Sequence, residues 1–367
     1  MWKSGLANPV FNNVFSSNEV KMQQWRCSNN KCDWTATSSF SKQILGTTHI
    51  DLIKLQVEYG ANSSYRSASK KLNNITGQRR INNHMQIRSV TNNVGNILSE
   101  NETIAQKAAP PKELCAVADG GHVHDANNRG HNFEAMMGKV FQPENVIRID
   151  KNHTKIIKKH CAGSGKHDNQ ATMKKNIASA AKKEGIDKTK TRVTALADGA
   201  KNCWNILESL IPLCLVLVCI LDWFHIGKYI KRIKISIPHI ETQLDEIRHS
   251  LWHGLVDKSL VQIKSLLNDV NKEKQAQLIT NFHEYIFENK NKIVDYNARR
   301  EANLPYTSHV AESTVEHMLN ERCKRKQKMQ WSRNGLHAVI QIRVSQASDD
   351  WDYDWENIIK PKLTVAA

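Results

Sequence analysis

The sequence has no apolar run long enough to cross a membrane. Its longest run, residues 210–221, is 12 residues and includes Pro212, whereas a spanning helix needs about 20. The first residues, MWKSGLANPVFNN, lack the basic-then-apolar order of a signal peptide. We therefore expect a cytoplasmic protein in a reducing compartment.

Nucleotide-binding loops are also missing. The chain has neither a GxxxxGK[ST] nor a GxGxxG motif, which counts against nucleotide hydrolysis and dinucleotide chemistry. Eight scattered cysteines do not form a disulfide framework. Several of them, including Cys214 and Cys219, lie in apolar stretches, so only Cys27 and Cys32 look like a metal-binding pair. Zinc normally takes four ligands, so two free cysteines in a loop, or half of a decayed zinc site, are favoured over a complete zinc ribbon.

Acidic residues are scarce relative to basic ones. The chain has 36 Asp and Glu against 52 Lys and Arg, which gives a formal net charge of +16. Such a surplus on an intracellular chain points to a polyanion, most simply a nucleic acid. At 367 residues, the length predicts two or three domains.

Residues 46–105 are predicted to form a helical DNA-binding domain, after an N-terminal segment at 1–45. Three helices are expected: one stopped by Gly60, one starting at a Ser63/Ser64 cap, and one over residues 78–98. Two short helices and then a basic helix are typical of a helix-turn-helix, whose last helix enters the major groove. An ordinary three-helix bundle with a solvated basic face is the alternative. The basic residues expected in or near the third helix are Arg79, Arg80, His84 and Arg88.

An α/β domain is expected after the linker that ends at Pro110-Pro111. Residues 106–225 alternate strand and helix signals, residues 226–300 are helical throughout, and residues 301–345 bring one more long helix and its neighbours. The tail, residues 346–367, is expected to lie outside the core. The prediction is a mixed α/β sheet interrupted by an all-helical insertion.

Two carboxylates occur in matched contexts within this domain. Asp119 and Asp198 each follow an apolar run and precede a glycine, in AVADGGH and ALADGAK. If the two strands pair in parallel, both carboxylates reach one end of the sheet, about 5 Å apart. Two carboxylates so close imply bound Mg²⁺ or Mn²⁺, and Glu312 from a later helix could complete the site. A single Asp-Gly is more often only a turn.

Several stretches resemble bacterial insertion-sequence DDE transposases with a ribonuclease H-like catalytic domain and a Mutator-like layout. The matching segments are THIDLIKLQVEYGANSSYRSA, INNHMQIRSVT, VADGGHVHD, ALADGAKNCWNI, LDWFHIGKYI and AESTVEHMLNERCKRKQKMQWSRNGLHAVIQIR. The resemblance implies Asp119, Asp198 and Glu312 as the catalytic triad, with two metal ions. It also implies a DxxH signature at Asp222 and His225, and the helical insertion at 226–300.

Two neighbouring acidic residues compete for these roles. Asp222 closes the next strand and should lie roughly 10 Å from Asp119, so its pair with His225 is either a direct DNA contact or an i,i+3 salt bridge. Glu316 is the fallback for Glu312, one helical turn later. A basic run follows that could track a phosphate backbone. Its members include Arg322, Lys324 and Arg325.

The expected function is a DNA transposase that binds terminal inverted repeats and joins them to target DNA. The resemblance implies a homo-oligomer working on paired ends. The alternative is a catalytically inactive DNA-binding protein derived from a transposase, because relatives carry a fuller N-terminal cysteine set and this chain would be a truncated or decayed copy. A third alternative is a metal-dependent nuclease that does not join strands.

Overall fold

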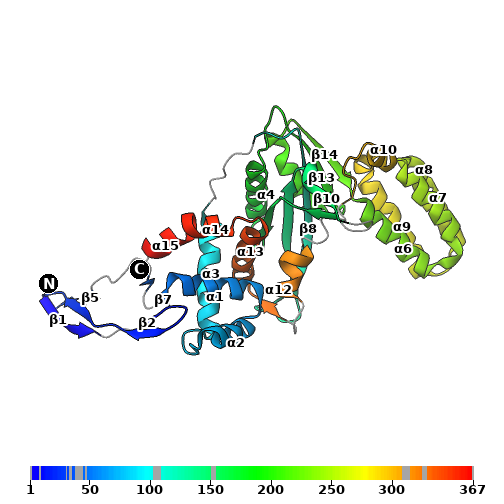
Figure 1. The fold of residues 1–367 in the computed structure, drawn as a ribbon. Coiled ribbons are helices and arrows are strands. Elements are labelled where there is room, and N and C mark those ends of the chain that lie inside the picture. The colour runs from blue at the N-terminus through cyan, green and yellow to red at the C-terminus, as the bar shows by residue number, and fades with distance from the viewer. Residues whose placement is uncertain are drawn as a thin grey trace. The chain divides into compact units, whose positions relative to one another are not determined.

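The computed structural model describes residues 2–7, 10–29, 31–32, 35–37, 44–45, 48–101, 109–149, 154–307, 315–324 and 329–365. The chain divides into two compact units, each described here by itself (Figure 1). The first contains residues 1–104 and 322–367, and the second contains residues 105–321. Residues 322–345, expected in the catalytic core, therefore belong to the unit that holds the N-terminal helices.

The first unit has two small sheets followed by helices. Its strands are β1 (Trp2–Ala7), β2 (Val10–Asn12), β3 (Ser17–Glu19), β4 (Met22–Arg26), β5 (Thr35–Thr37), β6 (Ile44–Leu45), β7 (Thr48–His49) and β15 (Gln330–Trp331). Its helices are α1 (Ile50–Asn62), α2 (Tyr65–Thr76), α3 (His84–Glu100), α12 (Glu321–Cys323, which begins at the unit boundary), α13 (Arg333–Ala347), α14 (Trp351–Asp354) and α15 (Lys360–Val365). The sheets have the orders β1-β4-β5 and β3-β2-β7-β6.

The three N-terminal helices follow the sequence with two corrections. Ser64 caps α2 by accepting from the Ser67 amide, and Gly77 ends it at φ 70°. Gly60 does not stop α1, which continues to Asn62. A Cβ at Gly60 would collide with Thr91 of α3. The glycine therefore allows close approach of α1 and α3. Helix α3 begins later than expected, after the N-cap Asn83.

The C-terminal tail does not lie outside the core, contrary to the prediction. Buried apolar residues recur every four positions at Trp351, Trp355, Ile359 and Leu363. They form one cluster with residues of α1 and α13, including Ile50, Ile53, Val57 and Ile342. The i,i+4 repeat is the pattern of an amphipathic helix, and the many charges around it obscured this pattern in the sequence.

The second unit is built on a mixed sheet with the strand order β12-β9-β8-β13-β14. The chain runs as β8 (Glu113–Asp125), β9 (Asn132–Phe141), β12 (His160–Ser164), α4 (Ala171–Lys183), β13 (Arg192–Ala197), α5 (Lys201–Leu207) and β14 (Val216–Leu221). Strands β12, β9 and β8 are antiparallel, while β8, β13 and β14 are parallel. Both α4 and α5 pack on the sheet and contact each other. The fold is therefore mixed α/β.

Two short strands form a separate small sheet, in which β10 (Val146–Arg148) pairs with β11 (Thr154–Ile156). The third sheet strand is β12, whose residues Cys161 to Ser164 are small and fully buried against β9. Strand β14 lies at the end of the sheet order, so its first residue Val216 is 43% exposed although the whole run is apolar.

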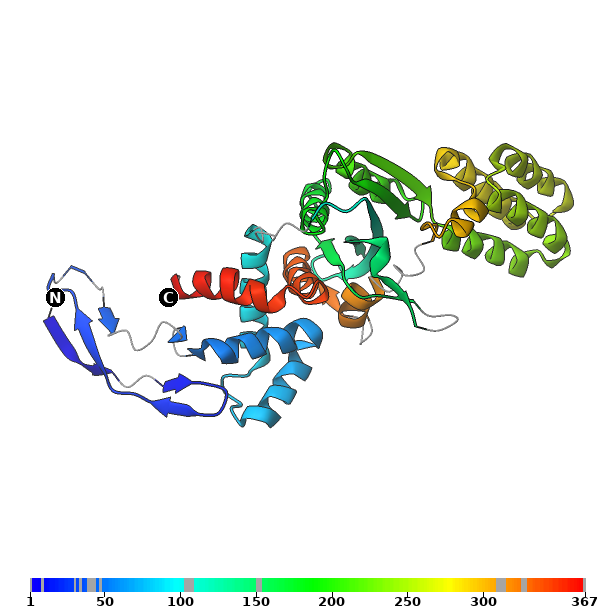
Figure 2. The ribbon, with the colours of Figure 1, turned by 45° about the horizontal axis from the view of Figure 1, so that its top comes forward.

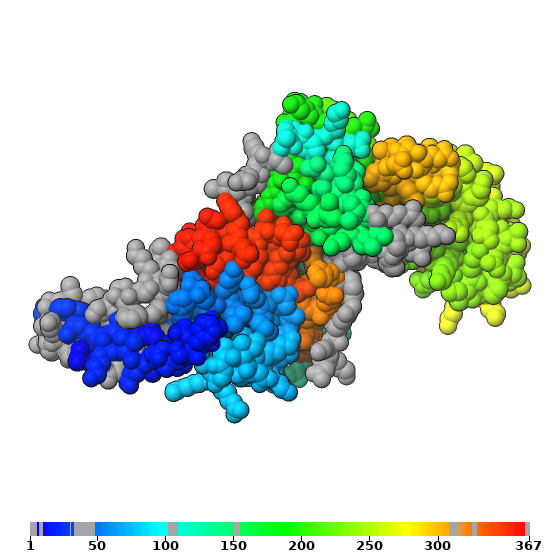
Figure 3. Space-filling model, viewed as in Figure 1, coloured from blue at the N-terminus to red at the C-terminus, as the bar shows by residue number. Residues whose placement is uncertain are grey.

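The predicted all-helical segment is present. Its helices are α6 (Trp223–Ser236), α7 (Glu241–Trp252), α8 (Val256–Ser265), α9 (Glu273–Glu288) and α10 (Tyr296–Glu301). They lie side by side in Figures 1 and 2 and form one continuous surface in Figure 3. Ring stacking of Tyr229 from α6 on Phe282 and Tyr285 from α9 helps to hold them together. Among the described helices, none has the length and apolar character that a membrane crossing requires.

Candidate active site

Three aspartates share one level at the edge of the second unit's sheet. Leu196 of β13 pairs with Val117 of β8, and Ala197 pairs with Leu221 of β14. Continuing each register places Asp119 and Asp198 in step, and Asp198 and Asp222 in step. The predicted parallel pairing of the two Asp-Gly strands is therefore present. Because β13 lies between β8 and β14, Asp222 is one strand further from Asp119, as expected.

Asp119 lies inside β8, although the sequence analysis placed it at a strand end. Strand β8 continues to Asp125, and Gly120 pairs with Met136 of β9 instead of forming a turn. A Cβ at position 120 would collide with the Glu134 carboxylate, so glycine lets the two strands and this carboxylate approach. Strands β13 and β14 end at the shared level, whereas β8 continues past it, so Asp119 lies beside the open end of β13.

The environment of Asp119 opposes its ionisation. Burial raises the pKa of the Asp119 carboxyl most, and the negative charge of Asp198 raises it further. The Gly120 amide, which donates to Oδ1 of Asp119 at 2.7 Å, acts in the opposite direction, as do the positive charges of His225 and Lys228. A half-buried carboxyl that senses both a like charge and two cations is typical of a functional site.

Both the side chain and the backbone oxygen of Asp198 accept hydrogen bonds. The Ala200 amide donates to its Oδ1 at 2.9 Å, and the Tyr285 hydroxyl donates to its backbone oxygen at 2.8 Å. Between them, Gly199 adopts φ +101°, a conformation that L side chains rarely adopt. The Asp-Gly turn therefore fixes the direction in which the carboxylate leaves β13.

The helical segment fastens this end of the sheet. Buried Asn289 accepts a hydrogen bond from Trp204 Nε1 at 3.0 Å and donates to the backbone oxygen of Tyr285 at 3.0 Å. Tyr296, also buried, donates to the backbone oxygen of Leu221, the last residue of β14, at 2.8 Å. Side chains of α9 and α10 thus hold the backbone at the ends of β13 and β14. The insertion is part of the site's support.

Asp222 and His225 form the i,i+3 pair that was one of two alternatives. Asp222 is fully buried, accepts from the Phe224 amide at 3.1 Å as the N-cap of α6, and lies 3.6 Å from Nε2 of His225. These contacts give Asp222 a structural role at the start of α6. His225 is also among the groups that lower the pKa of the Asp119 carboxyl.

A second group of polar residues, which the sequence did not indicate, lies beside the aspartates. Asn202 of α5 donates to the Glu134 carboxylate of β9 at 2.6 Å. Burial raises the pKa of the Cys203 thiol, and so do the charges of Asp198, Asp119 and Glu134. Glu134 is therefore a further acidic group near the site. Its only signal in the sequence is an isolated acidic residue in the apolar strand FEAMMGKVF.

The proposed third carboxylate lies outside the described residues. Glu312 falls within residues 308–314, and only the backbone of Glu316 is described, in a helical turn over Glu316–Asn320. Within the described ranges, no cluster of three or more His, Cys, Asp or Glu residues is placed to hold a metal ion. A metal site at Asp119 and Asp198 therefore stays a prediction.

The predicted DNA-binding residues separate into two groups. Arg79, Arg80, His84 and Arg88, which we call the α3 basic group, are all exposed, but Arg79 and Arg80 lie in the turn before α3. That turn is fixed by Asn82, which is fully buried and bonds to helix α1 and to residues 76–78.

Arg322 corrects the second group. Only 3% of it is exposed: its guanidinium lies over the rings of Tyr65 and Trp331, and its Nε donates to the backbone oxygen of Gly60 at 3.1 Å. It is packed inside the first unit and does not present its charge to a phosphate backbone. Lys324 is exposed, and Arg325 lies outside the described residues.

Cys27 and Cys32 lie at either end of a tight turn after β4. The Cys32 amide donates to the backbone oxygen of Asn29 at 2.9 Å. Hydrogen bonds from the Asn29 backbone and from the Cys32 thiol lower the pKa of Cys27. A zinc ion at this pair stays a prediction.

Comparison with known proteins places the chain in a family. The model of the uncharacterised protein family UPF0236 matches residues 41–354, so the chain belongs to this family. The match includes Asp119, Asp198, Asp222, Glu312 and the α3 basic group, and it excludes Cys27 and Cys32. A search of curated proteins gives no match.

Proposed function

We propose that this member of the UPF0236 family is a DNA transposase that cuts and joins phosphodiester bonds with the help of divalent metal ions. The observation that carries the proposal is the parallel register of β8 and β13, which brings Asp119 and Asp198 to one level. Carboxylates in step on adjacent parallel strands lie about 5 Å apart, within reach of a shared cation.

The sheet supports a ribonuclease H-like assignment. In that fold, three antiparallel strands are followed by two strands that run parallel to the first, and helices connect the later strands. The order β12-β9-β8-β13-β14, with α4 and α5 as connections, agrees with this description. The resemblance of VADGGHVHD and ALADGAKNCWNI to transposase segments points the same way.

The donor groups fit Mg²⁺ or Mn²⁺. Asp119 and Asp198 each use one oxygen to accept from a backbone amide, which orients the carboxylate, and the like charge of Asp198 raises the pKa of Asp119. With Glu312 as a third ligand, these residues would hold two ions. Such ions supply stabilisation of the attacking and leaving oxygens in an in-line displacement. Lys228 adds positive charge near Asp119.

The first unit would bind the element ends. Helices α1, α2 and α3 pack together, and the α3 basic group projects from the turn before α3 and from its N-terminal half. We assign α3 as the recognition helix of a helix-turn-helix, with terminal inverted repeats as its ligand. The net charge of +16 supports binding to a polyanion, and the resemblance implies a homo-oligomer on paired ends.

Metal binding tests this proposal before any DNA substrate is known. Titration of the full chain with Mn²⁺, followed by electron paramagnetic resonance, should show binding that disappears when Asp119→Asn and Asp198→Asn are combined. Asp187→Asn is the control, because Asp187 precedes β13 at the opposite end of that strand and bonds only within its own loop. Unchanged Mn²⁺ binding by the double variant would contradict the proposed site.

A further inference from the structure

Half of the formal net charge of the chain comes from one segment of the second unit. Residues 155–192 contain ten lysines and one arginine against three acidic residues, which gives +8 of the total of +16. The lysines of this segment that lie on α4 or beside β12 are called here the α4 basic strip. Its members are Lys158, Lys166, Lys174, Lys175, Lys182 and Lys183.

Helix α4 turns its apolar side inward and its lysines outward. It packs on β9 and β12 (Figure 1), and its buried residues are Met173, Ile177, Ala180 and Ala181. At 3.6 residues per turn, the four lysines of α4 lie on the opposite face of the helix or at its borders. The sequence of α4 contains no acidic residue. The outer face of this helix is therefore uniformly basic.

A buried contact joins the two parts of the strip. Nδ1 of His160, the first residue of β12, lies 2.7 Å from Oε1 of Glu184, which is fully buried at the C-terminal end of α4. Lys158 precedes His160 by two residues, and Lys182 precedes Glu184 by two residues. The contact therefore brings lysines from two separate segments to the same end of α4.

The acidic residues of the segment are held by neighbouring groups. The Glu184 carboxylate is turned inward to His160. Asp168 accepts a hydrogen bond from the Thr172 amide at 3.0 Å, and Asp187 accepts one from the Thr189 amide at 2.8 Å. Since the net charge of +8 already counts all three, the segment keeps a large excess of positive charge.

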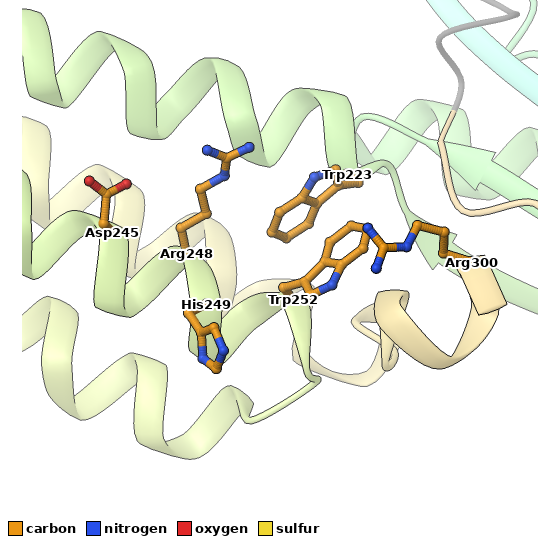
Figure 4. Close-up of a pocket in the computed structure, with 6 residues that line it drawn as sticks. All are labelled: Trp223, Asp245, Arg248, His249, Trp252 and Arg300. Atoms are coloured by element: carbon orange, nitrogen blue, oxygen red, sulfur yellow. The ribbon is translucent and has the colours of Figure 1, made fainter.

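The arginine beside the indoles of the helical segment is engaged within the protein. In the pocket of about 360 Å³ shown in Figure 4, the Arg300 guanidinium lies 5.2 Å from the centre of the Trp252 ring and donates to Oδ1 of Asn297 at 2.9 Å. Asp245 lines the same pocket. Lys158, Lys166 and Lys182 of the strip, in contrast, are exposed.

The strip lies on the face of the sheet away from the Asp119 side chain. A Cβ on Gly138 of β9 would meet Ile177 and Met173 of α4, so this position faces α4. Gly138 pairs with Ala118 of β8, which therefore faces α4 as well. Because successive side chains point to opposite faces of a strand, Asp119 points to the other face. The strip and the candidate active site are two separate surfaces.

We propose that the α4 basic strip binds the phosphate backbone of duplex DNA without regard to its sequence. This proposal rests on the proposed function, because it gives the DNA substrate a second contact surface. Lysine is a flexible point charge that suits phosphates, whereas the planar fork of arginine suits bidentate contacts to base edges. The strip contains only lysines, whereas the α3 basic group contains three arginines.

The composition and length of the strip favour a duplex over a single strand. Unpaired bases bind to proteins largely by stacking on aromatic side chains, and residues 155–192 contain no Phe, Trp or Tyr. The 13 residues of α4 extend over about 20 Å, which matches roughly six phosphates along one strand of a duplex. DNA held there would be a different stretch from the DNA at the carboxylates.

The test measures binding of the full chain to a random-sequence duplex over a range of salt concentrations, in EDTA. The strip variant combines Lys158→Gln, Lys166→Gln, Lys174→Gln and Lys182→Gln. Each lost phosphate contact should lower the slope of the log binding constant against log salt concentration by about 0.9, so the slope should fall by about 3 to 4 units.

The matched control removes the same charge from exposed lysines of the helical segment. It combines Lys258→Gln, Lys264→Gln, Lys272→Gln and Lys274→Gln, and its slope should stay close to the wild-type value. The strip variant should also lose affinity for element-end DNA and for random DNA by the same factor, because backbone contacts carry no sequence information.

Three results would overturn the proposal. They are an equal fall in slope for both quadruple variants, a changed preference for element-end DNA in the strip variant, and tighter strip-dependent binding of single-stranded than of duplex DNA. The strip variant should bind Mn²⁺ like the wild type, which also shows that it folds. If the slope falls as expected but Mn²⁺ does not bind at Asp119 and Asp198, the proposed active site fails and the strip stands.

Discussion

Gly199→Ala should destabilise the second unit far more than an ordinary glycine substitution. Gly199 has φ +101°, and an L residue in the left-handed region costs about 1–2 kcal/mol. An added Cβ would also lie 2.7 Å from Cε2 of Tyr285 and 3.0 Å from Nδ2 of Asn289. Neither side chain can retreat easily, because each is hydrogen-bonded to the site's backbone or to Trp204. Overpacking of this kind typically adds about 1–3 kcal/mol, so the total loss should be about 2–5 kcal/mol.

Gly130→Ala provides the matched control. Gly130 also has a positive φ, of +88°, but nothing lies within 4 Å of an added Cβ. It should therefore lose only the conformational part, about 1–2 kcal/mol. Urea unfolding of the full chain measures both variants against the wild type. Equal losses for the two variants would refute the claim that Tyr285 and Asn289 are packed tightly against the Asp-Gly turn.

Three further changes test other parts of the molecule. Burial lowers the pKa of Lys139 to about 7, so the folded state loses stability as the pH falls from about 10 toward 7. In urea unfolding, Lys139→Met should therefore stabilise the protein by several kcal/mol at pH 7 and by little at pH 10. An equal gain at both pH values would contradict this. Changing the arginines of the α3 basic group to alanine should weaken binding to element-end DNA. The slope of the log binding constant against log salt concentration should fall by about one unit per lost phosphate contact. The control, Lys258→Ala at an exposed position of α8, should change neither quantity. In a nicking assay, Glu312→Gln should bind DNA and fail to cut it, while Glu316→Gln should keep most activity. The reason is that a lost metal ligand affects the transition state more than substrate affinity. The reverse pattern would move the site by one helical turn.

Local patterns with a clear physical cause could be predicted from the sequence. The apolar run of β13, its Asp-Gly turn and the helix that follows are where the pattern placed them, as are the Ser64 and Gly77 caps of α2. The helical segment after His225 was also evident, because its apolar residues repeat with helical spacing.

Features that depend on distant partners could not be predicted. The Asp-Gly pattern before Gly120-Gly121 is typical of a turn, but pairing with β9 keeps these residues extended. Arg322 was expected in an exposed basic run, yet the ring of Tyr65, which is remote in sequence, and the ring of Trp331 lie against its guanidinium. Glu134 lies near the site because β9 pairs with β8 and because Asn202 of α5 donates a hydrogen bond to its carboxylate. The structural role of a charged residue or a glycine therefore depends on the residues that pack against it.

The most direct test of the central claim is single-turnover nicking of a supercoiled plasmid that carries the DNA flanking the coding sequence on both sides. In Mg²⁺, the wild type should nick this plasmid at the element ends. Asp119→Asn and Asp198→Asn should each abolish nicking while affinity for the same DNA stays within a few-fold, and Asp187→Asn should nick normally. Normal cutting by either of the first two variants would remove that aspartate from the site and contradict the account.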